Sequence, residues 1–134
     1  MKDTIFISHA NPQDNYFASW LASKLRLLGY QVWVDVRDIK PGQYFNRDFE
    51  AVIRDQSIRF LAVVSKDYIS KAKISDTGVM NEILCARTIK DVQDFIIPLK
   101  YDETDYAQFG SGLIGRFSVW PPTQFVARFY RATD

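Results

Sequence analysis

Glu82 is the residue of this sequence that is best placed to do chemistry. At about 100° per residue, it falls on one helical stripe with Val79, Ala86 and Ile89. A carboxylate on a buried stripe costs several kcal/mol if it loses water without gaining a partner. Glu82 therefore needs a cation, a set of donors or a catalytic role. The alternative is a position at the rim that reaches water, since Arg87 also interrupts the stripe.

Few other side chains offer reactive groups. His9 is the single histidine, so a Ser-His-Asp or Cys-His triad would have to use it. Cys85 is the single cysteine, which excludes an internal disulfide and metal sites built on paired cysteines. A small buried residue on a helix is the simplest interpretation of Cys85. We therefore expect neither a catalytic triad nor a metal site.

A lone carboxylate suits the cleavage of a glycosidic bond through an oxocarbenium-like transition state. Most glycosidases also need a carboxylic acid that protonates the leaving oxygen. An N-glycosidic bond to a pyridinium needs no such acid, because the leaving group already carries positive charge and departs neutral. One glutamate can then hold the ribose hydroxyls and stabilise the developing cation.

Strands and helices alternate along the chain. The strands are expected at Thr4–Ser8, Gln31–Asp35, Ser57–Ser65, Phe95–Leu99 and Phe117–Trp120. The helices are expected from Asp14 to Gly29, over Phe45 to Asp55, from Gly78 onward and from Thr123 to Arg131. Between the third strand and the Gly78 helix, the stretch Lys66 to Thr77 is rich in lysine and serine and is expected to be a polar connection.

This alternation predicts an α/β fold of the flavodoxin-like type. We expect a five-stranded parallel sheet in the order 2-1-3-4-5, with helices on both faces. Ligands in such sheets bind at the carboxyl ends of the strands, where the direction of winding reverses. That crevice would be lined by Ser8-His9-Ala10 on one side and by Ser65-Lys66 on the other, flanked by the loop after Asp35. Glu82 follows strand three and would lie beside it.

The composition is that of one globular domain spanning residues 1–134. Hydrophobic residues make up 47% and charged residues 25%, and the net charge is +1. This balance gives no electrostatic footprint for direct binding of nucleic acid. No apolar run approaches the length that spans a membrane, and the N-terminus reads as a strand rather than a signal peptide. A cytoplasmic protein without membrane partners is expected.

Other occupants of this fold lack their required residues here. A phosphoacceptor receiver domain needs an aspartate at the end of strand three, where this chain has Ser65. A flavodoxin needs a phosphate loop rich in Ser, Thr and Gly after strand one, and His9-Ala10-Asn11-Pro12 is not such a loop. The glycine fingerprint for dinucleotides and the P-loop lysine motif are also absent.

The ordered motifs resemble those of TIR (Toll/interleukin-1 receptor) domains over essentially the full length, in the variant common among bacterial members. They are Phe6-Ile7-Ser8-His9-Ala10, Asp35 to Gly42 with its Pro41-Gly42 turn, Phe60 to Ser65, the spacing of Ser65, Tyr68 and Ser70, and Phe117 to Trp120. In this resemblance, the loop Val36 to Tyr44 corresponds to the BB loop of the family.

The resemblance implies an activity. Many TIR domains cleave NAD⁺ at the nicotinamide–ribose bond, and the position of their catalytic glutamate matches Glu82. NAD⁺ would be a substrate, and no resident cofactor is expected. The residues that the crevice and the resemblance assign to contact with NAD⁺ are Ser8, His9, Ala10, Asp35, Arg37, Ile39, Phe45 and Ser65. Ser8, His9 and Ala10 would approach the nicotinamide, and Arg37 could meet a phosphate.

Three functions stay open at this point. The first is an NAD⁺-consuming enzyme, either a hydrolase or a cyclase, activated when the BB loop of one subunit completes its neighbour's site. It would belong to a bacterial defence protein with a sensor domain or partner. The second is a TIR adaptor that only self-associates, favoured by Gly78, where family members often carry tryptophan. The third is a glycosyl-transferring enzyme acting on nucleosides, against which the BB-loop pattern counts.

Overall fold

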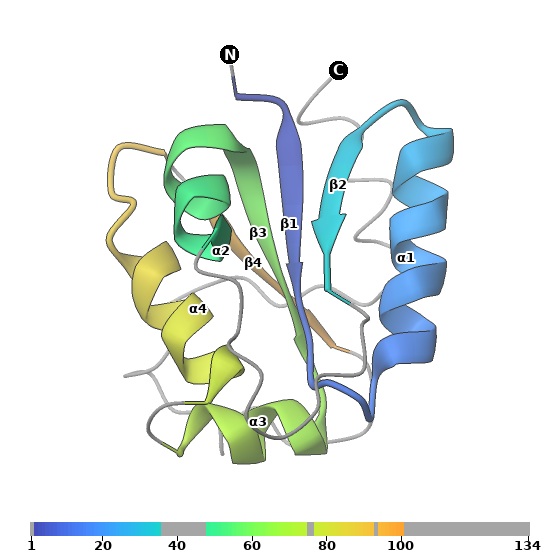
Figure 1. The fold of residues 1–134 in the computed structure, drawn as a ribbon, viewed down its shortest axis with the longest axis vertical. Coiled ribbons are helices and arrows are strands. Elements are labelled where there is room, and N and C mark those ends of the chain that lie inside the picture. Colours follow the sequence, from blue (N-terminus) through green and yellow to red (C-terminus); the bar gives the residue numbers. More distant parts are fainter. Residues whose placement is uncertain (1, 36–47, 75–76, 93, 101–134) are drawn as a thin grey trace.

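Four parallel strands form the centre of the protein in a computed structural model that describes residues 2–35, 48–74, 77–92 and 94–100 (Figure 1). The strands are β1 (Thr4–Ser8), β2 (Gln31–Val34), β3 (Ser57–Val64) and β4 (Ile96–Lys100). They lie in the order β2-β1-β3-β4. The predicted parallel sheet and the order of its first four strands are therefore confirmed. The fifth strand and the last helix predicted from the sequence lie outside the described residues.

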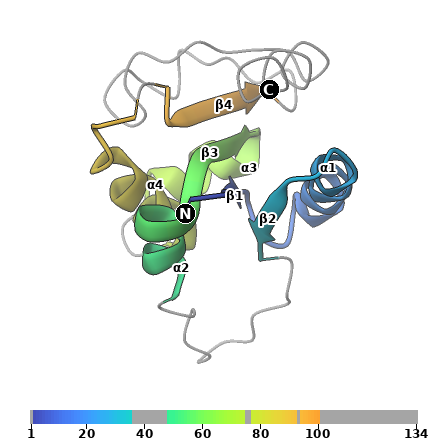
Figure 2. The ribbon, with the colours of Figure 1, turned by 90° about the horizontal axis from the view of Figure 1, so that it is seen from above.

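Helices cover both faces of the sheet, as Figure 2 shows from above. The helix α1 (Asn15–Leu27) packs on one face. The other face is covered by α2 (Asp48–Ala51), the π-helical turn η1 (Val52–Gln56), α3 (Lys66–Ala72) and α4 (Gly78–Arg87). None of the helices in the described part of the chain is long and apolar enough to cross a membrane.

The sequence of α1 explains its packing. Ala18, Leu21, Ala22 and Leu25 recur at helical spacing and are buried against the sheet. Gly29 ends this segment with a φ of 98°, a left-handed conformation that glycine adopts without steric cost. Trp20, on the outer side of this helix, is 44% exposed and stacks on Phe17.

The alternation of β1 divides its side chains between the two layers. Ile5 and Ile7 belong to the core under α1, whereas Phe6 belongs to the core under α4. Phe6 pairs in register with Trp33 of β2 and Phe60 of β3 and stacks on both rings, with centroid distances of 4.5 and 5.3 Å. Because side chains alternate along a strand, Ser8 comes to the same face as Phe6.

The prediction of a polar connection over Lys66 to Thr77 was wrong, because this stretch contains α3. Tyr68, Ile69 and Ala72 recur at helical spacing and are buried, so that the lysines and serines between them lie on the outer side. The side chain of Ser65 caps this helix by accepting the backbone N–H of Tyr68 at 3.1 Å.

Candidate active site

The site is built around Glu82 on α4. Thr77 caps this helix by accepting the N–H of Met80 at 3.1 Å, which sets the helix to begin at Gly78. Val79, Ile83 and Ala86 then face the core, and Glu82 shares their side with 5% of its surface exposed. The predicted stripe is thus present, and Glu82 lies within it.

A hydrogen-bonded chain joins Glu82 to the end of β1. Ser8 Oγ donates to Glu82 Oε1 at 2.7 Å, and Ser8 Oγ lies 2.9 Å from the hydroxyl of Tyr68 on α3. All three side chains are buried. The chain connects a strand end and two helices, through residues that are 60 and 74 positions apart in the sequence.

Burial controls the ionisation of the Glu82 and Tyr68 side chains in this hydrogen-bonded group. Loss of water raises the pKa of Glu82 to about 8, partly offset by the hydrogen bond from Ser8 and reinforced by the negative charge of Asp35. Burial also raises the pKa of Tyr68, so its phenol stays protonated at neutral pH. Glu82 is therefore an acid that retains its proton until the pH approaches about 8, or until a cation arrives.

A cavity of about 290 Å³ opens in front of Glu82, at the carboxyl ends of the strands. It is lined by Ile7, His9, Asn11, Pro12, Asp35, Lys71, Thr77, Gly78, Val79 and Glu82. Two carboxyl groups, of Asp35 and Glu82, and the ammonium group of Lys71 thus border the same space. The cavity lies where the winding reverses between β1 and β3. Of the residues predicted to line the crevice, His9 borders the cavity, whereas Ser8, Ala10, Ser65 and Lys66 do not.

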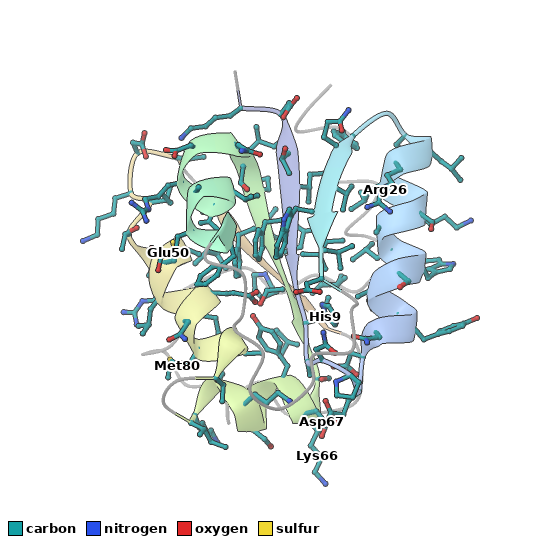
Figure 3. The ribbon with its side chains drawn as sticks, in the orientation of Figure 1. His9, Arg26, Glu50, Lys66, Asp67 and Met80 are labelled. Atoms are coloured by element: carbon teal, nitrogen blue, oxygen red, sulfur yellow. The ribbon has the colours of Figure 1, made fainter. Side chains whose placement is uncertain are left out.

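His9 is held as a neutral ring in the wall of this cavity. Figure 3 shows it near the carboxyl end of β1. Its Nε2 lies 2.7 Å from Asn15 Oδ1, while Asn15 Nδ2 donates to Asn11 Oδ1, so Nε2 carries the proton and donates. Burial lowers the pKa of His9, against the raising effects of Asn15, Asp14 and Asp35. Because a lowered pKa favours the uncharged form, the His9 ring is mostly neutral at neutral pH.

The loop after β1 is tied to the end of β2. Asn11 Nδ2 donates to the backbone carbonyl of Asp35 at 3.1 Å, and Lys71 Nζ donates to the carbonyl of Asn11 at 3.0 Å. Three walls of the cavity, from β1, β2 and α3, are thus joined at Asn11.

The structure brings together part of the predicted set of site residues. His9, Asp35 and Glu82 line the cavity, and Ser8 contacts Glu82 from behind. Ala10 is fully buried in the core, and the side chain of Ser65 caps α3 and donates to Asp14. The predicted contacts Arg37, Ile39 and Phe45, together with the BB loop Val36 to Tyr44, lie outside the described residues.

Sequence reasoning did not assign Tyr68, Lys71, Asn11 or Thr77 to the site. The burial of Tyr68 could have been predicted from its helical spacing with Ile69 and Ala72, had α3 been recognised. The described residues contain no group of three His, Cys, Asp or Glu side chains that would hold a metal ion.

The chain matches known proteins at the level of both sequence and fold. The family model described as TIR domain matches residues 5–125. An uncharacterized protein, y4cD of Sinorhizobium fredii, is 33% identical over 104 residues, which make up 75% of this chain and 16% of that protein. The chain therefore spans about a sixth of the length of this curated relative.

Two solved structures share the fold. The TIR domain of the Toll-related receptor TRR-2 from Hydra magnipapillata has a TM-score of 0.59 at 21% identity, over 96% of this chain and 93% of that one. The TIR domains of the activated Roq1 resistosome, which directly recognizes the pathogen effector XopQ, have a TM-score of 0.60 at 18% identity, over 98% and 75%. The family match over most of the sequence, together with this fold, shows that the chain belongs to the TIR domain family.

Proposed function

We propose that this TIR domain is an NAD⁺ nucleosidase in which Glu82 is the catalytic residue. The observation that carries the proposal is the buried Glu82 carboxyl group, which faces a cavity at the carboxyl ends of the strands and has a pKa of about 8. Perturbed carboxyl groups in such positions are typical of active sites.

The proposed reaction breaks the bond between C1′ of the ribose and the pyridinium nitrogen of nicotinamide. The bonding electrons leave with the nitrogen, so nicotinamide departs as a neutral molecule and needs no proton. The ribose becomes an oxocarbenium-like cation, which the Glu82 carboxylate stabilises. Attack by water gives ADP-ribose, and attack by an atom of the same substrate gives a cyclic product.

The raised pKa of Glu82 favours a cationic substrate. In the empty site the carboxyl group is mostly protonated at neutral pH, because a buried carboxylate lacks compensating charge. The pyridinium ring of NAD⁺ would supply that charge, lower the pKa of Glu82 and release its proton on binding. The carboxylate would then be present where positive charge moves onto the ribose.

The other charges of the cavity suit a ligand that also carries phosphate. Asp35 lies with Glu82 on the wall of the cavity, whereas Lys71 contributes an ammonium group from α3. An ammonium group has three donors, one of which meets the carbonyl of Asn11. We assign to Lys71 a contact with a phosphate group of the dinucleotide. Ser8 orients Glu82, and His9 and Asp35 border the nicotinamide ribose.

Activity is proposed to depend on self-association, with the BB loop of one subunit completing the site of the next. The Roq1 neighbour supports this, since its TIR domains belong to an activated assembly that recognizes a pathogen effector. By analogy, this domain would act in the cytoplasm within a bacterial defence protein and be triggered by a sensor domain or partner.

Nicotinamide release from NAD⁺ tests the proposal. Wild type, Glu82→Gln and the control Glu50→Gln are compared at high protein concentration, with a crowding agent that promotes assembly. Glu50 is an exposed acid on α2, so its variant keeps wild-type activity. We expect Glu82→Gln to lose activity by a factor of at least about 100, because it removes the charge that stabilises the cation.

The other outcomes have clear meanings. Equal release by wild type and Glu82→Gln would move catalysis away from Glu82. No release by either protein in the assembled state would favour the adaptor function. Equal specific activity in dilute and concentrated wild type would contradict the dependence on self-association.

A further inference from the structure

Tyr68 is a buried polar side chain that the proposed reaction does not itself use. It projects from α3, is 0% exposed, and its hydroxyl lies 2.9 Å from Ser8 Oγ. A phenylalanine would fill almost the same space without bringing a hydroxyl group into the core. Burying that hydroxyl has a cost that must be met by hydrogen bonding.

Counting protons gives the contact a direction. The Ser8 hydroxyl has one proton, and it is donated to Glu82 Oε1 at 2.7 Å. Ser8 Oγ must then act as the acceptor towards Tyr68, whose phenol keeps its proton at neutral pH. The chain therefore runs from Tyr68 through Ser8 to Glu82, with each hydroxyl donating towards the carboxyl group.

A chain with this direction favours the ionised carboxylate. A hydroxyl that accepts one hydrogen bond becomes a stronger donor in the next. The protonated form of Glu82 gains less, because a neutral carboxyl oxygen is a weaker acceptor than a carboxylate. The chain also fixes Oε1 against Ser8, which holds the carboxyl group in one orientation towards the cavity.

We propose that Tyr68 is a positioning residue which, through Ser8, orients the Glu82 carboxylate and favours its ionised form for the reaction. This role rests on the proposed NAD⁺ cleavage. Tyr68 does not line the cavity with Glu82, His9 and Asp35, so it acts through Ser8 rather than by touching the substrate.

Other titratable and charged groups lie around Glu82 and its helix and influence how it titrates. Asp35 raises its pKa from the end of β2, while His9 and Lys71 line the same cavity from β1 and α3. Arg54 of η1 and Glu50 of α2 influence the pKa of Cys85, which lies three residues after Glu82 on α4. The variants below leave all of these groups in place.

The first test is the pH profile of kcat/KM for nicotinamide release. Tyr68→Phe is expected to move the rise in activity to higher pH by about half a pH unit, which lowers activity about threefold at pH 7 and leaves it nearly unchanged at high pH. Ser8→Ala is expected to move the rise in activity to higher pH by about one pH unit, which lowers activity about tenfold at pH 7. Tyr16→Phe, on the exposed side of α1, is the matched control.

The double variant Ser8→Ala/Tyr68→Phe separates positioning from packing. If Tyr68 acts through Ser8, removing the phenol hydroxyl has no further effect once Ser8 is alanine. An equal shift in both backgrounds would overturn the proposal. So would a loss of activity in Tyr68→Phe that is the same at every pH, because such a loss indicates a structural role.

A titration of the Glu82 carboxyl carbon by ¹³C NMR needs no activity and keeps the two proposals distinguishable. The Glu82 pKa is expected to rise in Tyr68→Phe and to fall when 3-fluorotyrosine, a stronger donor, replaces Tyr68. An unchanged Glu82 titration in both proteins overturns the positioning role, even if NAD⁺ is cleaved. Shifted titrations in a protein that releases no nicotinamide support the hydrogen-bonded chain and reject the proposed reaction.

Discussion

The two faces of the sheet bury different kinds of side chain. Under α1, strands β1 and β3 present Ile5, Ile7, Leu61 and Val63 to a core that contains aliphatic residues along its whole length. Under α4, the same strands present Phe6, Phe60, Ala62 and Val64, but β1 then ends in Ser8. The second face therefore combines an apolar core with a polar end.

This difference separates stability from chemistry within one sheet. Among the described residues, the core under α1 is built from buried aliphatic side chains, so packing dominates its contribution. The α4 face accepts a buried carboxyl group whose pKa is about 8, which is a cost to the folded state whenever Glu82 is ionised. Substitutions on the two faces should therefore affect different properties.

The largest effect on stability is expected from the α1 face. Leu25→Ala should lower the free energy of unfolding by about 2 to 5 kcal/mol, because Leu25 is fully buried and its loss leaves a cavity. Urea denaturation followed by circular dichroism measures this change. Leu27→Ala on the same helix is the control, since Leu27 is 81% exposed and should change stability by no more than about 0.5 kcal/mol. Similar losses in both variants would contradict the assignment of the core.

On the α4 face, Glu82→Gln should increase stability as its catalytic activity is lost. The folded state binds the Glu82 proton more tightly than the unfolded chain, whose carboxyl group has the ordinary pKa of 4.5. Wild-type stability should therefore fall as the pH rises from 4.5 through about 8. Glutamine carries no charge and avoids this loss, so the variant should gain about 2 to 4 kcal/mol at about pH 9.

Unfolding free energies of both proteins at a series of pH values provide the measurement. The difference in unfolding free energy between wild type and Glu82→Gln should be small below pH 4.5 and should grow as the pH rises from 4.5 to about 8. Glu50→Gln is the control, because Glu50 is about half exposed and paired with Arg54 on the same surface. A constant difference between wild type and Glu82→Gln at all pH values would show that Glu82 is not a strongly perturbed acid.

The smallest effect is expected at the basic side of the cavity. Lys71→Ala should raise KM for NAD⁺ about 3- to 10-fold and leave kcat nearly unchanged, because a phosphate contact away from the reacting bond stabilises ground and transition states alike. Steady-state kinetics at two salt concentrations measure the change in KM, with Lys73→Ala, at the exposed residue directly after α3, as the control. A loss confined to kcat would place Lys71 in the chemistry instead.

The sheet could be predicted because its signals are local. The apolar runs that form β1 and β3, and the helical stripe of Glu82, are short-range patterns that tertiary contacts reinforce. The helix α3 was missed because it has only seven residues and its apolar positions are diluted by lysine and serine. Its cap, Ser65, was interpreted as a ligand contact rather than as a helix start.

The site was only partly predictable for a different reason. The position of Glu82 beside a crevice followed from the topology, but its partners depend on the register and on where α3 ends. Ser8 faces Glu82 because β1 pairs with β3 so that Ser8 lies opposite Ala62. Tyr68 reaches Ser8 only because α3 packs below the strand ends. Contacts across 60 or more residues leave no periodic trace in the sequence.

The cap of α3 has a consequence for how changes spread through this domain. Ser65 holds the backbone of Tyr68 by accepting its N–H, while its own hydroxyl donates to Asp14 at the start of α1. The same Tyr68 holds Ser8 with its side chain. The start of α1 is thus connected to the Glu82 carboxyl group on the opposite face of the sheet. The connection runs from Asp14 through Ser65, Tyr68 and Ser8. A displacement at Asp14 would therefore reach the Glu82 carboxyl group without any group entering the cavity.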